Sequence, residues 1–453
     1  MTQTGLVLVT VAAVALLLFL VLKLRIQAFI SLLITSMFVG IATGMPLGEV
    51  IKSIQNGMGG TLGFVATVVG LGAIFGQILE ASGGAESLAK SLVNKFGKDK
   101  ASWALVLTGF IVAIPVFFDV GFIILVPIVY ALSKDTKKSV LFYGIPLLAG
   151  LAVTHSFIPP TPGPVAVAEI IGADLGWVIL FGFIVGLPTA IVAGPVFGKY
   201  ISEKINIKVP TYMIQEIDND KKEDNDFPSF SLVTSIIGVP LVLILLNTLT
   251  GVLVKQGSIQ EGFITNILGF LGHPFVALSI ATLLALYLLG TKRGFTKQQL
   301  LDLSTKALAP AGLIILVTGA GGVFKQILID SGVGKMLANT ISNSNLPPII
   351  LAYILAVVVR ITQGSATVSM ITSAGIIAPV MDAFALGAPD RALIVLSIAA
   401  GATILSHVND SGFWLVGRYF GMTEQQTLKS WTIMETIISL VGFAVALILS
   451  FLV

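Results

Sequence analysis

Long apolar segments recur along the whole chain, and short polar loops separate them. A helix that crosses the hydrocarbon layer of a membrane needs about 20 mostly apolar residues. No stretch without such segments is long enough to form a separate soluble domain. The pattern predicts an all-α polytopic membrane protein with about ten spanning helices, at residues 5–22, 26–43, 58–80, 140–158, 175–198, 230–253, 264–290, 308–329, 391–417 and 431–453.

Two further apolar stretches, 102–131 and 347–383, are too long for one helix and too short for two ordinary spans. Pro115 and Asp119 interrupt the first, and Gln363 and Gly364 interrupt the second. Irregular backbone is tolerated at membrane depth where it is buried in protein or lines a water-filled cavity. We therefore predict two re-entrant hairpins.

The basic residues indicate how the spans are oriented, because cytoplasmic loops collect Lys and Arg. If the N-terminus is outside and each hairpin returns to the side it left, 20 of the 26 Lys and Arg residues face one side. Treating 102–131 as a single crossing would invert every later loop. The sequence thus predicts both termini outside and a cytoplasmic linker at 199–229, which ends in an acidic cluster at 218–226.

The composition agrees with this class of protein. Only 11% of the 453 residues are charged, whereas soluble domains have roughly 25%. The chain has no cysteine, which excludes disulfides and thiol chemistry. The net charge of +3 gives no sign of a nucleic-acid partner. No cofactor or metal is expected, and the expected surroundings are a lipid bilayer.

The two halves of the chain resemble each other. Residues 70–83 match residues 319–332 at a constant offset, with eight identities in fourteen positions. A predicted hairpin follows each copy, and then an apolar segment with a polar interruption. In the predicted topology the copies run in opposite directions, which is a common build of secondary transporters. The resulting division is 1–57 for N-terminal spans, 58–198 for repeat 1, 199–229 for the linker, 230–307 for connecting spans and 308–453 for repeat 2.

Ionisable residues at membrane depth are costly and often mark a substrate or ion path. The candidates are Asp119, His155, Arg360, His407 and Asp410. Asp119 could carry a proton, accept hydrogen bonds from substrate hydroxyls, or simply cap its own turn. Either histidine could exchange a proton near neutral pH, or serve as a neutral hydrogen-bonded strut.

The break in the second hairpin has the features of an anion site. A half-helix that begins after Gly364 offers free backbone N–H groups and the positive end of its dipole. Hydroxyls come from Thr362, Ser365, Thr367 and Ser369, and the guanidinium of Arg360 suits a carboxylate. Ser369 is expected to bond back to its own backbone. Arg360 could instead be a structural partner of one of the two aspartates, Asp119 or Asp410.

The two interrupted segments could also line a substrate cavity. Four prolines at 159–164 cannot continue a regular helix, so carbonyl groups are left free, and Thr161 and Gly163 are candidates for substrate binding. In the second interruption, 406–412, Asn409 and Asp410 offer an amide and a carboxylate to a polyhydroxylated ligand.

Enzyme chemistry is not supported. The residue types of a hydrolase triad occur at Ser406, His407 and Asp410. A triad depends on the spatial arrangement of its members, and residues so close in sequence do not readily adopt it. The metalloprotease pattern H-E-x-x-H is absent, and residues 329–336 depart from the phosphate-loop pattern. A channel would need a continuous polar pore, which the paired hairpins argue against.

Several motifs together resemble the gluconate permease family of bacterial proton symporters, and the resemblance extends over essentially the whole chain. They are Gly59–Gly63 with the segment 70–83, Phe118–Phe122, Pro159–Pro164, Gly364–Val368 and His407–Trp414. The resemblance implies uptake of a sugar acid with a proton across an inner membrane. It also implies a homodimer and an elevator-like transport cycle.

Details within the motifs concern specificity. Arg360 and the residues 407–410 resemble the sugar-acid branch of the family rather than the D-serine branch. Thr161 stands where many members have His, and Asp119 stands where many have Glu. We therefore expect a symporter for gluconate or a related aldonate, with Asp119, His155 or His407 as the proton carrier. The alternative is D-serine, glycerate or another small carboxylate.

Overall fold

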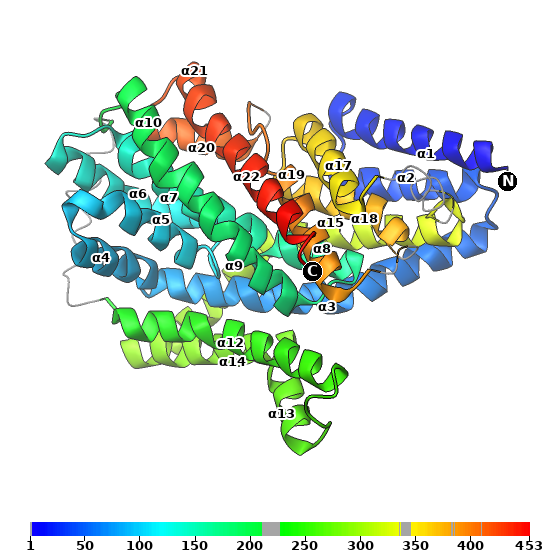
Figure 1. Ribbon diagram of the computed structural model, residues 1–453, viewed down its shortest axis with the longest axis horizontal. Coiled ribbons are helices and arrows are strands. Elements are labelled where there is room, and N and C mark those ends of the chain that lie inside the picture. The colour runs from blue at the N-terminus through cyan, green and yellow to red at the C-terminus, as the bar shows by residue number, and fades with distance from the viewer. Residues whose placement is uncertain are drawn as a thin grey trace.

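The structure is a computed structural model that describes residues 2–210, 227–334, 336, 346–381, 384, 386–408 and 410–453 (Figure 1). The described part is built from α-helices, joined by short turns and a few π- and 3₁₀-helical segments. The acidic cluster at 218–226 lies outside the described residues. In chain order the α-helices are α1 (Gln3–Leu18), α2 (Ala28–Ala42), α3 (Leu47–Ala81), α4 (Gly84–Phe96), α5 (Ala101–Val112), α6 (Phe118–Thr136), α7 (Val140–Phe157), α8 (Pro162–Ile171), α9 (Leu175–Ile191), α10 (Phe197–Lys204), α12 (Phe230–Lys255), α13 (Phe263–Leu271), α14 (Pro274–Leu284), α15 (Lys297–Asp330), α17 (Pro348–Gln363), α18 (Ala366–Met381), α19 (Ala388–Gly401), α20 (Ser411–Phe420), α21 (Glu424–Thr427) and α22 (Ile433–Leu449).

Helices α3 and α15 pack along each other and contain the two matching segments. They have 35 and 34 residues. A Cβ atom on Gly57 would lie 2.6 Å from the carbonyl oxygen of Gly322, and one on Gly322 would lie 2.0 Å from Thr61 Oγ1. Side chains at either glycine would therefore separate the two backbones.

Both long helices begin before the predicted spans do. α3 begins at Leu47 and α15 at Lys297, so the predicted boundaries at 57/58 and 307/308 fall inside helices. The reason is that the first turns carry polar side chains on an exposed face, such as Lys52, which pairs with Glu49 at 2.8 Å. Hydropathy marks the apolar part of a helix, not its ends.

The two stretches predicted as hairpins are broken helix pairs. α5 and α6 are separated by residues 113–117, and α17 and α18 by Gly364 and Ser365. α17 ends where it does because Gly364 has a φ of 80°, which favours glycine. α17 and α18 pack against each other, so the chain reverses at the second break. α6 and α18 each begin directly after a break.

The two segments with polar interruptions are also broken. α7 and α8 are separated by residues 158–161, at the proline cluster. α19 and α20 are separated by residues 402–410, a longer gap than the predicted interruption at 406–412. The core of the molecule is formed where α7, α8 and α19 pack against the hairpins and against α9 and α22.

The predicted span 264–290 was wrong as a single helix. α13 ends at Leu271 and α14 begins at Pro274, and α13 projects away from the α12 and α14 pair (Figure 1). His273 caps α14 by accepting a hydrogen bond from the Phe275 N–H at 3.4 Å. A proline is well suited to the first turn of a helix, so the Gly272–His273–Pro274 sequence starts a new helix instead of continuing the old one.

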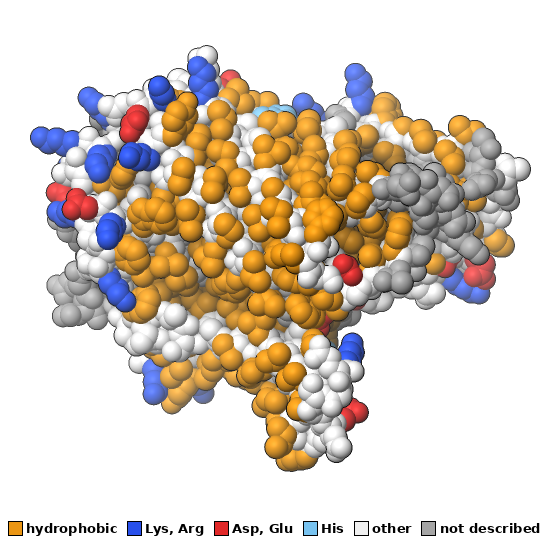
Figure 2. Space-filling view, viewed as in Figure 1, with side chains coloured by type: hydrophobic (Ala, Val, Ile, Leu, Met, Phe, Trp, Pro, Cys, Tyr) orange, Lys and Arg blue, Asp and Glu red, His pale blue; other side chains and the backbone are white. Residues whose placement is uncertain are grey.

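The surface matches a membrane environment. Seven helices of the described chain are long and apolar enough to cross a membrane, and four shorter apolar helices accompany them. Apolar side chains cover most of the face in Figure 2. Exposed large apolar side chains include Leu187 of α9 and Leu440 of α22. Basic side chains gather at one end of the same view.

Candidate functional site

A cavity of about 510 Å³ lies where both hairpins meet both broken helices. Its walls come from α6, α7, α15, the turn between α17 and α18, the segment 403–412, and the start of α22. Seven of the residues singled out in the sequence line it, namely Asp119, His155, Arg360, Gly364, Ser365, Thr367 and Asp410. Another hollow of similar size, beside Arg418 and Glu424, contains none of them. The first cavity is therefore the candidate site.

Three helix N-termini meet at this cavity, those of α6, α18 and α20. Phe117 precedes α6 and offers no side-chain cap. At α18, Ser365 Oγ accepts a weak hydrogen bond from Val368 N at 3.4 Å. At α20, Asp410 Oδ1 accepts one from Gly412 N at 3.0 Å. Because unpaired N–H groups and the helix dipole favour negative charge, the cavity is suited to an anion.

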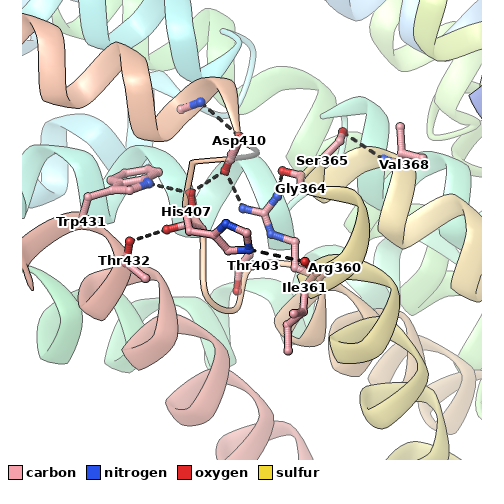
Figure 3. Close-up of polar contacts among 12 residues, drawn as sticks. Arg360, Ile361, Gly364, Ser365, Val368, Thr403, His407, Asp410, Trp431 and Thr432 are labelled. Carbon is pink, nitrogen blue, oxygen red and sulfur yellow. Dashed lines mark hydrogen bonds and ion pairs between the residues drawn. The ribbon is translucent and has the colours of Figure 1, made fainter. Parts of the chain in front are cut away.

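Arg360 and Asp410 form an ion pair at the edge of the cavity (Figure 3). Arg360 Nη2 lies 2.5 Å from Asp410 Oδ2, and the two side chains are 2% and 15% exposed. Arg360 Nη1 donates to the carbonyl of Gly364, which the reversed backbone turns toward it. Of the two partners that the sequence offered for Arg360, Asp410 is the one it has. Both terminal nitrogens of the guanidinium are thus engaged within the protein, while Nε is buried without a partner among the described residues.

Asp410 belongs to a chain of hydrogen bonds that ties the broken segment to the last helix (Figure 3). Ser406 Oγ donates to Asp410 Oδ2 at 2.5 Å, and Trp431 Nε1 donates to Ser406 Oγ at 2.6 Å. Thr432 Oγ1 donates to the Ser406 carbonyl. Trp431 and Thr432 belong to a π-helical turn, Leu428–Thr432, and such turns are frequent at functional sites. The chain fixes the position of the Asp410 carboxylate and, through it, of Arg360.

Asp119 and His155 also line the cavity. Asp119 is in the first turn of α6 and is exposed to the cavity. The ring of His155 packs edge-on against Phe117, with centroids 6.3 Å apart. Its Nδ1 is buried and has no hydrogen-bond partner in the described residues. The interpretation of His155 as a hydrogen-bonded strut is therefore not supported at this nitrogen.

The residues that line the cavity do not include Thr161, Gly163 or His407. Thr161 Oγ1 donates to the Ile158 carbonyl at 2.6 Å, and a Cβ on Gly163 would lie 2.8 Å from Met370 Sδ. Both positions pack the start of α8. His407 Nε2 lies 3.4 Å from the carbonyl oxygen of Ile361 (Figure 3) and does not line the cavity. Asn409 lies outside the described residues.

Ser369 differs from the sequence expectation. It is buried in α18, but its hydroxyl has no partner in the described chain, so it does not bond back to its own backbone. That expectation was wrong, because the serine rule for membrane helices is a tendency that local geometry can override.

Sequence reasoning also missed two residues of the cavity wall, Trp431 and Glu435. Glu435 is only 4% exposed. It is the one charged residue in the apolar segment 431–453, and the cost of an ionisable group at membrane depth was the signal that could have found it.

Comparison with known proteins agrees with this geometry. A family model described as "GntP family permease" matches residues 5–452. The chain belongs to the GntP permease family. A gluconate permease of Pseudomonas aeruginosa is 42% identical over 95% of this chain and 94% of its own length. A low-affinity gluconate transporter of Escherichia coli K12 is 41% identical over 99% of each chain.

A solved structure shares the fold. The crystal structure of the YdaH transporter of Alcanivorax borkumensis superimposes with a TM-score of 0.59, covers 90% of each chain and is 14% identical in sequence. At that identity the likeness concerns the fold alone. Together with the family and the seven apolar helices, it makes this permease a multi-pass membrane protein of a transporter family, and not an enzyme family.

Proposed function

We propose that this permease carries gluconate or a related sugar acid across a cell membrane together with a proton. The observation that carries the proposal is the meeting of three helix N-termini and a buried arginine at one cavity. A volume of about 510 Å³ falls within the roughly 300–1,000 Å³ of small-molecule sites. The names of the relatives, gluconate permease and gluconate transporter, supply the substrate class.

The substrate carboxylate would lie at the start of α18. There the N-terminus of the helix, Ser365 and Thr367 face the cavity. Because Asp410 and the Gly364 carbonyl engage the two terminal nitrogens of Arg360, the arginine would act through its charge and its Nε, rather than by a two-pronged contact. The hydroxyl groups of the substrate would extend toward Asp119, which is exposed to the cavity.

The architecture that we propose has two inverted repeats. α3 and α15 carry the matching segments 70–83 and 319–332. Each is followed by a broken helix pair, α5 with α6 or α17 with α18, and then by a broken helix. This order supports a substrate site between the repeats, with hairpins that re-enter from opposite sides and a cytoplasmic linker between the halves.

The remaining parts of the proposal follow from the family resemblance and the positions of the basic residues. They are an inner-membrane location with both termini outside, a homodimer, and an elevator-like cycle. Asp119 and His155, which line the cavity, are retained as groups that could handle a proton. His407 is not retained, because it lies outside the cavity wall.

The experiment is uptake of labelled gluconate into proteoliposomes, with and without an inward proton gradient. D-Serine, glycerate and other aldonates serve as competitors. Gluconate accumulation that requires the proton gradient and is inhibited by other aldonates supports the proposal. The proposal is contradicted if gluconate uptake is the same with and without the proton gradient, or if D-serine inhibits uptake more strongly than aldonates do.

Two threonines provide a matched test of the site. Thr367 lines the cavity, whereas Thr362 Oγ1 donates to the carbonyls of Val358 and Val359 in its own helix at 3.0 and 2.8 Å. Replacement of Thr367 by Val keeps the shape and removes one hydrogen bond, which should weaken gluconate binding about 3- to 10-fold. Thr362→Val should leave binding unchanged. Equal effects of the two replacements would contradict the placement of the substrate.

A further inference from the structure

Glu435 is the unexplained charged group of the cavity. It lies in the first turn of α22, directly after the π-helical turn 428–432, and is 4% exposed. In the described chain, Arg360 and Glu435 are the two charged side chains that are buried. Glu435 Oε1 has no hydrogen-bond partner among the described residues. A buried carboxylate without a partner is costly when ionised, so its position needs an explanation other than stability.

The charge of Arg360 is already balanced by Asp410. Arg360 is already paired with Asp410 at 2.5 Å, and Asp410 receives a further hydrogen bond from Ser406. Glu435 is close enough for its charge to interact with both members of this pair. The attraction to Arg360 and the repulsion from Asp410 oppose each other. An ionised Glu435 would therefore give this wall of the cavity a net negative charge.

The other charged or titratable groups near Glu435 come from few elements. His155 of α7 and Asp119 of α6 line the same cavity. Tyr353 of α17 also faces α22, and its hydroxyl lies 2.9 Å from Ser439 Oγ. None of these three groups brings a permanent positive charge to Glu435.

The remaining helices packed against α22 add little. α9 and the π-helical turn 192–196 contain no ionisable side chain. The charged residues of α19 are in its first turn, where Arg391 Nη1 donates to the Ile171 carbonyl at 2.6 Å and Asp390 accepts from Gly387 N at 2.9 Å. Lys429, in the turn before α22, is exposed. The state of Glu435 is thus decided within the cavity.

We propose that Glu435 is the proton-binding group of coupled transport, an inference that rests on the proposed function. When a proton sits on its carboxylate, the wall formed by Arg360, Asp410 and Glu435 is neutral, and a substrate carboxylate can occupy the helix N-termini beside it. When the proton leaves, the wall becomes negative and repels the substrate. The proton and the anion therefore enter together on one side and leave together on the other, with no bond made or broken except that to the proton.

The decisive variant is Glu435→Gln, which keeps the size of the side chain and imitates its protonated form. An anion and one proton together carry no net charge, so a pH difference of one unit should support about tenfold accumulation in the unmodified protein. The variant should still exchange labelled for unlabelled gluconate across the membrane, and its exchange rate should no longer vary with pH. It should show no gradient-driven accumulation.

Three further variants complete the test. Glu80→Gln changes a half-buried glutamate of α3 that does not line the cavity, and it should keep both accumulation and pH dependence. Asp119→Asn tests the competing carboxylate. Glu435→Asp keeps a carboxylate in place, and it should accumulate gluconate with a shifted pH midpoint. If Glu435→Gln does not fold, this aspartate variant decides, and an unchanged pH midpoint overturns the inference.

The possible results separate two failures. If the unmodified protein neither exchanges nor accumulates gluconate, the proposed function is wrong. If it accumulates gluconate and Glu435→Gln does so equally well, the proposed function stands and the role of Glu435 is wrong. Loss of exchange in a folded Glu435→Gln, or loss of coupling in Asp119→Asn alone, also overturns the role of Glu435.

Discussion

Replacement of Asp410 by Asn tests whether the ion pair organises the site. The change keeps the size of the side chain but removes the negative charge that faces Arg360 Nη2 at 2.5 Å. It also weakens the acceptor for the Ser406 hydroxyl. Arg360 is 2% exposed and would be left as a buried cation with the Gly364 carbonyl as its remaining acceptor in the described chain.

The size of the effect follows from this burial. Removal of one member of a buried ion pair destabilises a protein by about 3–5 kcal/mol, because the other charge loses its partner. Asp410 is 15% exposed, so water in the cavity reduces the loss, and we expect a value at the lower end, about 3 kcal/mol. Gluconate should raise the unfolding temperature of the variant more than that of the unmodified protein, since its carboxylate can take the place of the missing charge.

A double-mutant cycle measures the interaction energy between Arg360 and Asp410. The free energy of unfolding is measured in detergent micelles for Asp410→Asn, for Arg360→Met and for the two changes together. Arg360→Met removes the charge that needs a partner, so the combined variant should be less destabilised than the sum of the single ones, by about 2 kcal/mol. Additive effects within about 0.5 kcal/mol would refute the pairing. A gluconate-induced shift that is the same in Asp410→Asn and the unmodified protein would refute the carboxylate position.

Two further predictions concern packing and the hydrogen-bond chain. Gly322→Val should destabilise the protein by about 1–3 kcal/mol in thermal unfolding, since a Cβ there would lie 2.0 Å from Thr61 Oγ1. The control is Gly312→Ala on the same helix, which should be neutral or stabilising because no atom lies within 4 Å of the new Cβ. Equal losses of stability in both variants would contradict the packing. Ser406→Ala should cost about 1–3 kcal/mol, because Trp431 Nε1 loses its acceptor, and the indole fluorescence should shift; an unchanged spectrum and stability would contradict the bond.

Much of the fold could be predicted because membranes make hydropathy informative. The breaks at Pro115 and Gly364 were visible, since a proline removes a helical hydrogen bond and a glycine can adopt the φ of 80° that ends α17. The boundary between α13 and α14 was missed, because apolar residues continue through Gly272 and the turn is set by Pro274 and its cap. A hydropathy window averages over such a short signal.

The site was less predictable, since it is formed by residues far apart in the chain. The sequence offered Asp119 and Asp410 as alternative partners of Arg360 but did not decide between them, because the pairing joins positions 50 residues apart and no local pattern carries that information. We expected Thr161 and Gly163 to bind substrate because they belong to a proline cluster. Instead, the Thr161 hydroxyl bonds to the Ile158 carbonyl, and Gly163 packs against Met370 of α18. Glu435 was missed because a hydropathy window averages a single acidic residue with the long apolar run around it.

The pairing of Arg360 with Asp410 changes what an arginine can do in a carrier of anions. A free buried guanidinium would hold a carboxylate in every state of the cycle, and a carrier must also release its substrate. With the charge balanced by Asp410, the cavity attracts an anion mainly through the helix N-termini, whose partial charges are about half a unit each. Three such ends together amount to about one and a half unit charges, so the single negative charge of Glu435 offsets most of this attraction. Protonation of one side chain on the cavity wall is then enough to switch the site between binding and release.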